Sequence, residues 1–435
     1  MYIKNILAYQ ILDSRGYPTV AVRLQTSDQT FVYAKVPSGA STGTREALEL
    51  RDNNPNYFFN KSVLKAISNI NQTLAPLFIN KPLNDFKKLD QLLIDQDNEQ
   101  KSIFGANAIL ALSIAFLKAS AYAAQKPLYQ YIKEDLLNNF EPFYYAPIPM
   151  MNFINGGAHA DNNLTFQEFM IMPVGANDFA HAVQMGAEIF YQLHQILKKD
   201  QLATTKGDEG GYAPSLSTNQ VALDYISKAI TSANYTPVKN EKIEPYTVGI
   251  ALDVAGSEFF DNNSKKYILN INDQKVFYDS AEFTKYLLNL VEAYPILSIE
   301  DPFDENEWVA FTNLTKTKKV QVVGDDLYTT NKVYLQRGID TQATSAILIK
   351  PNQIGSVSET LETIQLAQQN NIKVIISHRS GETEDDFIAD LAIGVGADMI
   401  KTGSLSRSER IAKYNRILEI QTDLKNNLIY QPHKK

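Results

Sequence analysis

Two kinds of hydrophobic periodicity divide the chain into a first part and a second part. Near the N-terminus, apolar and polar residues alternate over residues 6–12, 19–24 and 31–36, and turn-forming residues separate these runs. A period of two is typical of strands with one buried face, so we expect an antiparallel meander of three strands. After residue 43 the spacing becomes helical, which predicts helices over residues 45–51, 62–77, 85–94 and 105–124. Strands followed by helices indicate a small α+β domain.

The second part contains short apolar runs that keep ending in a charged residue. From residue 248 onward these runs lead into Asp253, Glu300, Asp325, Lys350, His378 and Lys401. Most of these end points lie about 25 residues apart, which is room for one strand, one helix and two loops. Continuous apolar runs are typical of parallel strands buried on both faces. Charged residues at their C-terminal ends predict a (β/α)₈-type barrel with its active site on that face.

These patterns predict an α/β protein with two domains. We place a smaller α+β domain at residues 1–135 and the barrel at residues 145–435, with the boundary in a stretch punctuated by prolines. The most apolar segment, residues 103–117, is shorter than the ~20 residues that span a bilayer. We therefore expect it to be a buried helix and expect no membrane span.

Composition narrows the classes of function. The 435 residues include 41 basic and 49 acidic side chains, for a net charge of −8. The sequence has no basic stripe of the kind that indicates nucleic-acid binding. The chain has no cysteine, which excludes disulfides, thiolate catalysis and Cys-ligated metals. Its start lacks the long apolar core of a signal peptide, so we expect a cytoplasmic protein.

Three carboxylates occupy matching positions on successive expected strands. Asp253, Glu300 and Asp325 each follow a buried run, and a barrel would bring them together. A single carboxylate at a strand end is more often a helix N-cap or a surface residue. Three in register make that interpretation weak, and three hard oxygen ligands without cysteine suit Mg²⁺.

Cationic residues follow the remaining strands. Lys350, the trio His378-Arg379-Ser380 and Lys401 would face the carboxylates across the barrel. They could form a structural ion-pair network, but there are more cations than simple pairing needs. Arg379 could offer two parallel N–H donors to an oxyanion, and Ser380 could offer a hydroxyl. A lysine near a metal-bound oxyanion is suited to removing a proton alpha to a carboxylate.

Two glycine-rich segments precede the regular repeats. A Gly-Gly turn delivers His159, and an expected strand over residues 165–171 contains Glu168. A second segment, residues 207–211, suspends Glu209 between glycines. Alone, each is more simply a tight turn with an exposed acid. The other histidines, His181, His194 and His433, are expected at the surface or in the tail.

The order of these motifs resembles the enolase family over the whole chain. Examples are Ser-Ile-Glu-Asp-Pro-Phe at residues 298–303 and Ser-His-Arg-Ser-Gly-Glu-Thr at residues 377–383. Further matching motifs lie at residues 11–16, 36–43, 46–52, 155–159, 167–170, 207–211, 400–403 and 407–415. The resemblance implies a lyase that interconverts 2-phosphoglycerate and phosphoenolpyruvate with two Mg²⁺ per active site.

The resemblance also implies a role for each matching residue. Lys350 matches the base that takes the C2 proton, and Glu209, supported by Glu168, matches the group that helps the C3 hydroxyl leave. His159 is implied as a further catalytic residue. The implied ligands of the first Mg²⁺ are Asp253, Glu300 and Asp325, and Ser41 matches a ligand of the second. Substrate contacts are implied for Ser41, His159, Glu168, Glu300, Asp325, Lys350, His378, Arg379, Ser380 and Lys401.

Some positions depart from the family pattern or carry a further expectation. Tyr17, Lys206 and Pro351 stand where enolases usually have Asn, a small apolar residue and Val, and none replaces a chemical group. A lysine base must be neutral, so we expect nearby positive charge to lower the pKa of Lys350. Loop-forming residues predict mobile lids over residues 39–41, 157–163 and 257–266.

Other functions stay open at this point. An acid-sugar dehydratase or racemase of the same superfamily would share the metal carboxylates and the lysine base. A non-catalytic protein on an enolase scaffold is a second alternative. The resemblance further implies a homo-oligomer, either a dimer or an octamer. The C-terminal Lys434-Lys435 also permits plasminogen binding from a secondary pool at the cell surface.

Overall fold

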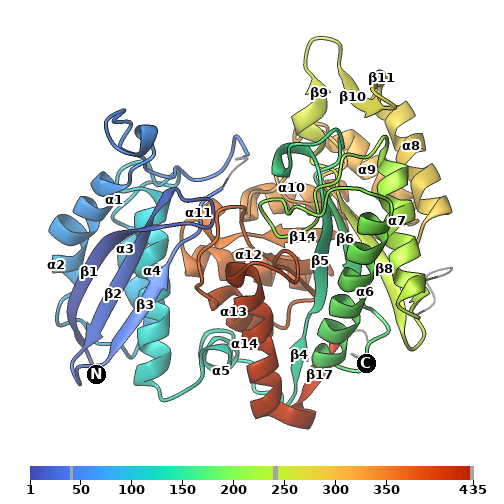
Figure 1. The fold of residues 1–435 in the computed structure, drawn as a ribbon. Helices are drawn as coiled ribbons and strands as arrows, with labels where there is room; N and C mark the ends of the chain where they lie inside the picture. The colour runs from blue at the N-terminus through green and yellow to red at the C-terminus, as the bar shows by residue number, and fades with distance from the viewer. Residues whose placement is uncertain (40–42, 239–242, 432–435) are drawn as a thin grey trace.

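The computed structural model describes residues 1–39, 43–238 and 243–431. An N-terminal sheet with its helices lies on one side of the molecule, and a barrel lies on the other side (Figure 1). The predicted meander is confirmed as β1 (Ile3–Leu12), β2 (Pro18–Thr26) and β3 (Phe31–Lys35), paired antiparallel in that order. The β1–β2 turn contains Gly16 at φ +79°, and Asp13 Oδ1 accepts the backbone N–H groups of Arg15 and Tyr17.

Helices cover the inner face of this sheet. A continuous helical segment comprises α1 (Leu64–Ser68), a π-helical turn (Asn69–Leu74) and α2 (Ala75–Phe78), and it is followed by α3 (Phe86–Ile94), α4 (Ala106–Ala123), α5 (Leu128–Tyr131) and a second π-helical turn (Ile132–Leu136). Helix α4 packs on β2 and β3. It is long and apolar enough to cross a membrane, but 83% of it is buried inside the protein, as expected of a core helix.

The helix predicted over residues 45–51 is wrong. This segment forms turns and extended chain, while a single turn of 3₁₀ helix follows at Phe58–Asn60. The Ala47 N–H donates to Gln353 O at 2.8 Å, and the Leu48 N–H donates to Gln100 O at 2.8 Å. Hydrogen bonds to other parts of the chain thus replace the helical ladder, so tertiary contacts override local propensity here.

Eight strands close the predicted barrel. Their order is β5 (Ile148–Asn155), β6 (Glu168–Met172), β8 (Thr247–Asp253), β12 (Ile296–Glu300), β13 (Gln321–Gly324), β14 (Ala346–Ile349), β15 (Lys373–Ser377) and β16 (Met399–Lys401), and β16 pairs with β5. Six of these strands end where the apolar runs of the sequence predicted. Nearly all their residues are buried, as expected for parallel strands covered by helices.

Strand β6 departs from the parallel arrangement expected from the sequence. It pairs antiparallel with both β5 and β8, whereas the other neighbouring barrel strands pair parallel. The connection from β5 to β6 is a loop with a 3₁₀ turn at Gly157–His159, and without a crossover helix the chain reverses direction. The first residue of β6, Glu168, therefore lies in register with Asn155 and Asp253, at the end of the barrel where β5 and β8 finish.

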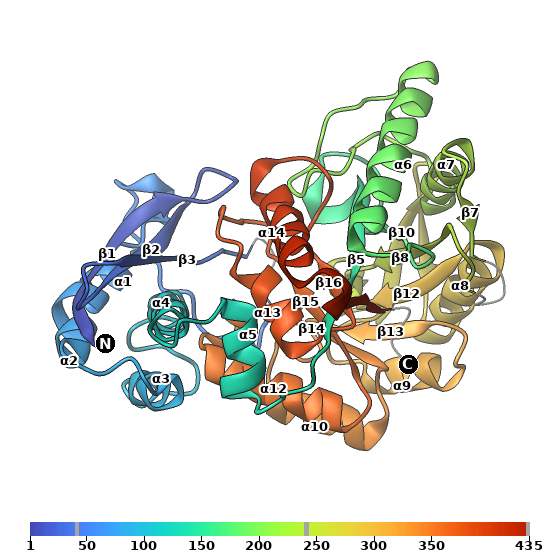
Figure 2. The ribbon, with the colours of Figure 1, turned by 90° about the horizontal axis from the view of Figure 1, so that it is seen from below.

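Helices surround the barrel (Figure 2). They are α6 (Phe179–Lys199), α7 (Asn219–Ser232), α8 (Ser280–Ala293), α9 (Trp308–Lys316), α10 (Lys332–Thr341), α11 (Pro351–Ile354), α12 (Val357–Gln369), α13 (Phe387–Val395) and α14 (Ser408–Leu424). Short elements complete the fold: β4 (Tyr144–Ala146) with β17 (Leu428–Tyr430), β7 (Thr236–Pro237), the sheet β9 (Phe260–Asp261), β10 (Lys266–Ile271) and β11 (Gln274–Tyr278), and 3₁₀ turns at Gly256–Phe259 and Lys425–Asn427.

The N-terminal part packs directly on the barrel helices. Ser113 Oγ on α4 accepts the Val357 N–H at 2.9 Å, and Asp90 Oδ2 on α3 accepts the Ser358 N–H at 2.9 Å. These side chains satisfy backbone donors at the start of α12. The domain boundary between residues 135 and 145 stays a prediction.

Candidate active site

The carboxylates at the strand ends surround the side chain of Lys401, the last residue of β16. Lys401 Nζ lies 2.8 Å from Asp253 Oδ2, 2.9 Å from both carboxylate oxygens of Glu300 and 3.1 Å from Glu168 Oε1. All four residues are buried. Burial lowers the pKa of Lys401, but the surrounding carboxylates together raise it by more. The net pKa therefore lies well above its ordinary value. Lys401 is therefore a fixed cation in this arrangement.

Lys350 pairs with a different carboxylate. Its Nζ contacts Asp325 Oδ2, and Gln353 Nε2 donates to the other Asp325 oxygen at 2.9 Å. The backbone of Lys350 is extended, and Pro351 opens the short helix α11. Burial lowers the pKa of Lys350, whereas Asp325 raises it, and the net pKa is above its ordinary value. This direction is opposite to the one we expected from burial and the nearby cations.

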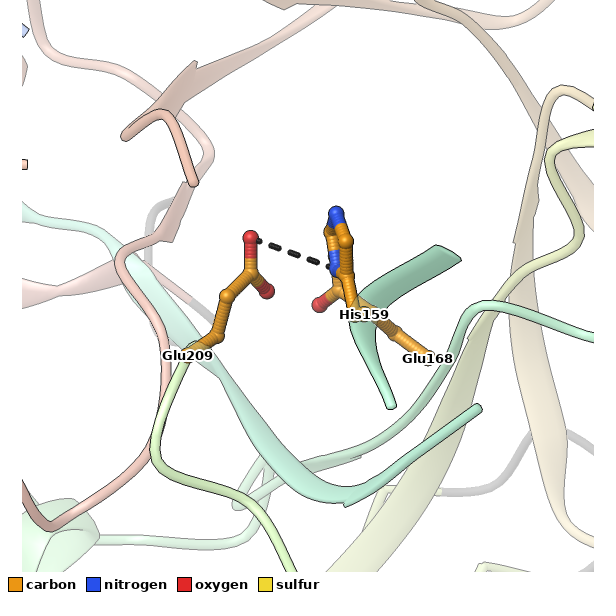
Figure 3. A group of neighbouring side chains, drawn as sticks. All are labelled: His159, Glu168 and Glu209. Atoms are coloured by element: carbon orange, nitrogen blue, oxygen red, sulfur yellow. Dashed lines mark ion pairs between the residues drawn. The ribbon is translucent and has the colours of Figure 1, made fainter. Parts of the chain in front are cut away.

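A second group of titratable side chains comprises His159, Glu168 and Glu209 (Figure 3). His159 Nδ1 is 3.5 Å from Glu209 Oε1 and 3.8 Å from Glu168 Oε1. Asn152 Nδ2 lies 3.0 Å from Glu168 Oε2 and 3.1 Å from Glu209 Oε2, so it bridges the two acids. His378 Nε2 approaches Glu209 Oε1 from another side at 3.4 Å. The two glycine-rich segments thus deliver their residues to one buried cluster and not to the surface.

The two glutamates have opposite pKa shifts. Burial and the neighbouring Glu209 raise the pKa of Glu168 well above its ordinary value. Burial also raises the pKa of Glu209, but His159 and His378 together lower it by more. The net pKa of Glu209 is well below its ordinary value. Because the two buried carboxylates repel each other, Glu168 is the more readily protonated of the two.

The residues implied in phosphate binding come from the loop after β15. Arg379 forms a bidentate ion pair with Glu46, at 2.9 Å from Nη1 and 3.2 Å from Nη2. Ser380 Oγ lies 3.1 Å from His159 Nε2, which links this loop to the glutamate cluster. Ser41 lies outside the described residues.

The donor set fits a hard divalent cation. Asp301, Asp325 and Asp326 offer carboxylate oxygens within 4.8 Å of one another, and among the described residues His159, Glu168 and Glu209 form the other such group. Burial and the neighbouring acids raise the pKa of Asp326 to about 8 and that of Glu300 well above its ordinary value. Buried carboxylates therefore outnumber the lysines beside them, and a divalent cation would balance this excess charge.

Only one of the three expected carboxylate ligands of the first Mg²⁺ belongs to these groups. Asp325 belongs to the first of these groups, whereas Asp253 and Glu300 lie against Lys401. The cavity that the cluster lines has a volume of about 30 Å³. This is room for roughly two water molecules.

Sequence reasoning missed several side chains that hold this site together. Asn152 is a buried polar residue in the middle of the apolar strand β5, and that position in the pattern could have revealed it. Gln353 and Glu46 lie outside the strands, and nothing in the spacing places them beside Asp325 and Arg379. His181 and His194 are both partly buried on α6, away from this cluster, while His433 lies outside the described part of the chain.

Comparisons with known proteins agree over the full length. A family model described as "Enolase, N-terminal domain" matches residues 3–132, and one described as "Enolase, C-terminal TIM barrel domain" matches residues 143–435. An enolase of Ureaplasma parvum is 60% identical over 100% of this chain and 99% of its own length. Enolases of Mycoplasma pneumoniae and Mycoplasma genitalium are 47% and 48% identical over 98% and 97% of the chain, and over 94% and 93% of their own lengths.

Proposed function

The chain belongs to the enolase family, as a hydro-lyase that interconverts 2-phosphoglycerate and phosphoenolpyruvate in glycolysis, and we propose roles for its own residues in that reaction. One observation carries these roles. A lysine with a single carboxylate partner and a buried glutamate pair lie on different sides of the carboxylate group around Lys401. This arrangement suits removal of a proton and departure of a hydroxyl from neighbouring carbons of one substrate.

Lys350 is the proposed base that removes the C2 proton. The contacts favour Lys350 over Lys401, because Lys401 lies within 3.1 Å of three carboxylates, whereas Lys350 pairs with Asp325 alone. A group held by one partner is easier to neutralise than a group held by three. Lys401 instead supplies a permanent positive charge for the substrate carboxylate.

Glu209 is the proposed group that assists departure of the C3 hydroxyl. Glu168, whose pKa is raised, would supply the proton for this step, and His159 and Asn152 contact the glutamate pair. Arg379 and Ser380 would hold the phosphate, with His378 beside them. Enolase-superfamily sites use a lysine or histidine base together with one or two Mg²⁺, which is a known pattern for such sites.

A metal cofactor is implied by the family, and we propose two Mg²⁺ per active site. Asp253, Glu300 and Asp325 would hold the first ion and Ser41 would contribute to the second. When bound, Mg²⁺ supplies Lewis-acid stabilisation of the negative charge that develops on the substrate carboxylate. The excess of buried carboxylates over lysines supports a divalent cation at this position.

The wider setting is also proposed from family membership. We propose a cytoplasmic homo-oligomer, a dimer or an octamer, which light scattering would distinguish. A secondary surface pool that binds plasminogen through the C-terminal lysines is a further proposal, and binding by a chain lacking Lys434 and Lys435 would contradict it.

One assay tests the chemical proposal directly. Purified protein is mixed with 2-phosphoglycerate, and absorbance is followed at the phosphoenolpyruvate band, after chelation and after Mg²⁺ is restored. We expect turnover to disappear with chelator and to return with Mg²⁺. Turnover that survives exhaustive chelation would contradict the metal assignment, and turnover of substrates without phosphate would favour an acid-sugar dehydratase.

A further inference from the structure

A buried arginine outside the proposed catalytic residues joins the two loops that carry them. Arg410 lies in the first turn of α14 and is fully buried. Its Nη1 donates to Arg379 O at 2.6 Å and lies 2.7 Å from His378 Nδ1. Its Nη2 donates to Ser380 O at 2.6 Å and to Asp208 O at 3.2 Å. One guanidinium thus ties the loop after β15 to the loop that presents Glu209.

The contact with His378 determines which ring nitrogen carries the proton. A guanidinium donates hydrogen bonds and has no acceptor, so His378 Nδ1 must accept. The neutral ring then carries its proton on Nε2, which lies 3.4 Å from Glu209 Oε1. Burial lowers the pKa of His378 to about 4, in agreement with a neutral ring.

The chain makes room for this arginine. Gly403 has φ +80°, and a Cβ atom there would lie 2.7 Å from Arg410 Cδ and 2.9 Å from Glu209 O. The next residue, Ser404, donates its backbone N–H to Glu209 O at 2.9 Å. The segment after Lys401 therefore holds Glu209 from one side while Arg410 holds its loop from the other.

We propose that Arg410 is a positioning residue for the hydroxyl-departure step, acting by holding His378 as an Nε2–H donor toward Glu209. This proposal rests on the proposed role of Glu209. Without Arg410, the imidazole can adopt the other tautomer and turn a lone pair toward the carboxylate, which repels it. Proton removal at C2 does not involve this contact, because Lys350 lies with Asp325 and not with His378.

The tautomer can be measured in the unchanged protein. Nitrogen-15 NMR of histidine-labelled protein distinguishes protonated from unprotonated ring nitrogens, and His378→Gln identifies the His378 signals. We expect Nε2 protonated and Nδ1 unprotonated at pH 7. A protonated Nδ1, in either the other tautomer or the imidazolium, would overturn the proposal. This result does not depend on whether any Arg410 variant folds.

Arg410→Met then tests the consequence for the reaction. We expect product formation to fall on the order of 10²-fold, the usual contribution of a positioned acid, while exchange of the C2 hydrogen with heavy water stays near the wild-type rate. Equal loss of exchange and product formation would mean that Arg410 only supports the fold. A different result would show that the proposed role of Glu209 is wrong: Glu209→Gln would lose C2 exchange as well as product formation.

Lys413 offers a matched control on the same helix. It is equally buried and donates to Glu382 Oε2, Thr383 O and Glu409 O at 2.7–2.8 Å. It holds the far end of the same loop without contacting His378. We expect Lys413→Met to leave the ratio of exchange to product formation unchanged, and an equal shift of that ratio would contradict a specific role for Arg410.

Discussion

At the scale of single residues, the two lysines at the barrel mouth differ in what surrounds them. Lys401 lies among Asp253, Glu300 and Glu168, whereas Lys350 contacts Asp325. A buried cation with several carboxylate partners resists deprotonation, because each partner favours the charged form. The number of partners therefore separates a fixed charge from a candidate base, although both residues are lysines at strand ends.

Asp325 gives the first prediction at this scale. Asp325→Asn removes one ligand charge while keeping the shape of the side chain, and we predict that Mg²⁺ affinity falls about tenfold or more. The measurement is a Mg²⁺ titration of turnover. Unchanged Mg²⁺ affinity in Asp325→Asn would contradict the assignment of Asp325 as a ligand.

The second prediction separates the two proton-transfer steps. Lys350→Ala removes the proposed base, so it should lose both phosphoenolpyruvate formation and exchange of the C2 hydrogen with heavy water. Glu209→Gln should lose product formation and retain measurable exchange, because proton removal comes first. Exchange is followed by NMR of the substrate. Wild-type exchange in Lys350→Ala would point to another base, with Lys401 the first to test.

The active-site residues could be predicted from the sequence where they lie at the end of a strand. Asp253, Glu300 and Lys401 are each the last residue of a strand, and Asp325 and Lys350 directly follow one, so spacing along the chain sufficed. Arg410 could not be found in this way. It reaches the site from a helix, and its partners are backbone carbonyls of distant loops, which leave no pattern in the sequence.

At the scale of elements, the reversal of β6 decides where Glu168 lies. In a parallel strand, the first residue would sit at the opposite end of the barrel from the active site. Because β6 runs antiparallel, Glu168 pairs with Asp253 at the active end. The apolar run predicted a strand but not its direction, since direction depends on whether the connection is a loop or a crossover helix.

The segments expected to be lids provide a prediction for elements. Asn270 Nδ2 donates to Asn163 O at 3.2 Å, so the loop at residues 157–163 contacts the β9–β11 sheet. Because the cavity has a volume of about 30 Å³, we expect these segments to open and close around a substrate. We predict that substrate with Mg²⁺ slows their amide hydrogen exchange, with α7 as an internal reference. Equal exchange in the free and bound protein would contradict a lid. The third segment, residues 39–41, lies mostly outside the described residues.

At the scale of the whole molecule, the N-terminal part reaches the loop that we propose binds the phosphate. Ser38 N–H donates to Gly381 O at 2.7 Å, and Gly381 N–H donates to Ser38 O at 3.0 Å. A Cβ atom at Gly381 would lie 2.4 Å from Asp13 Oδ2, so glycine is needed for this close approach. The segment that leads to Ser41 thus begins beside Ser380, and the active site draws on both parts of the chain.

The histidine held by Arg410 links the active site to the pH dependence of stability. His378 faces Glu209, Arg410 and, at longer range, Glu382, and its pKa falls from 6.5 to about 4 on burial. Below pH 6.5 the unfolded chain binds a proton that the folded protein does not, so this group destabilises the fold as pH falls toward 4. The full loss is on the order of 3 kcal/mol.

We predict that the thermal midpoint of the wild type drops more between pH 7 and pH 4.5 than that of His378→Gln, measured by circular dichroism without Mg²⁺. Gln keeps an acceptor for Arg410 and a donor toward Glu209 but does not titrate, so the difference between the two proteins isolates the imidazole. Parallel pH profiles would mean that His378 gains its proton in the folded protein as readily as in the unfolded chain, and that the neutral ring assigned to it is wrong.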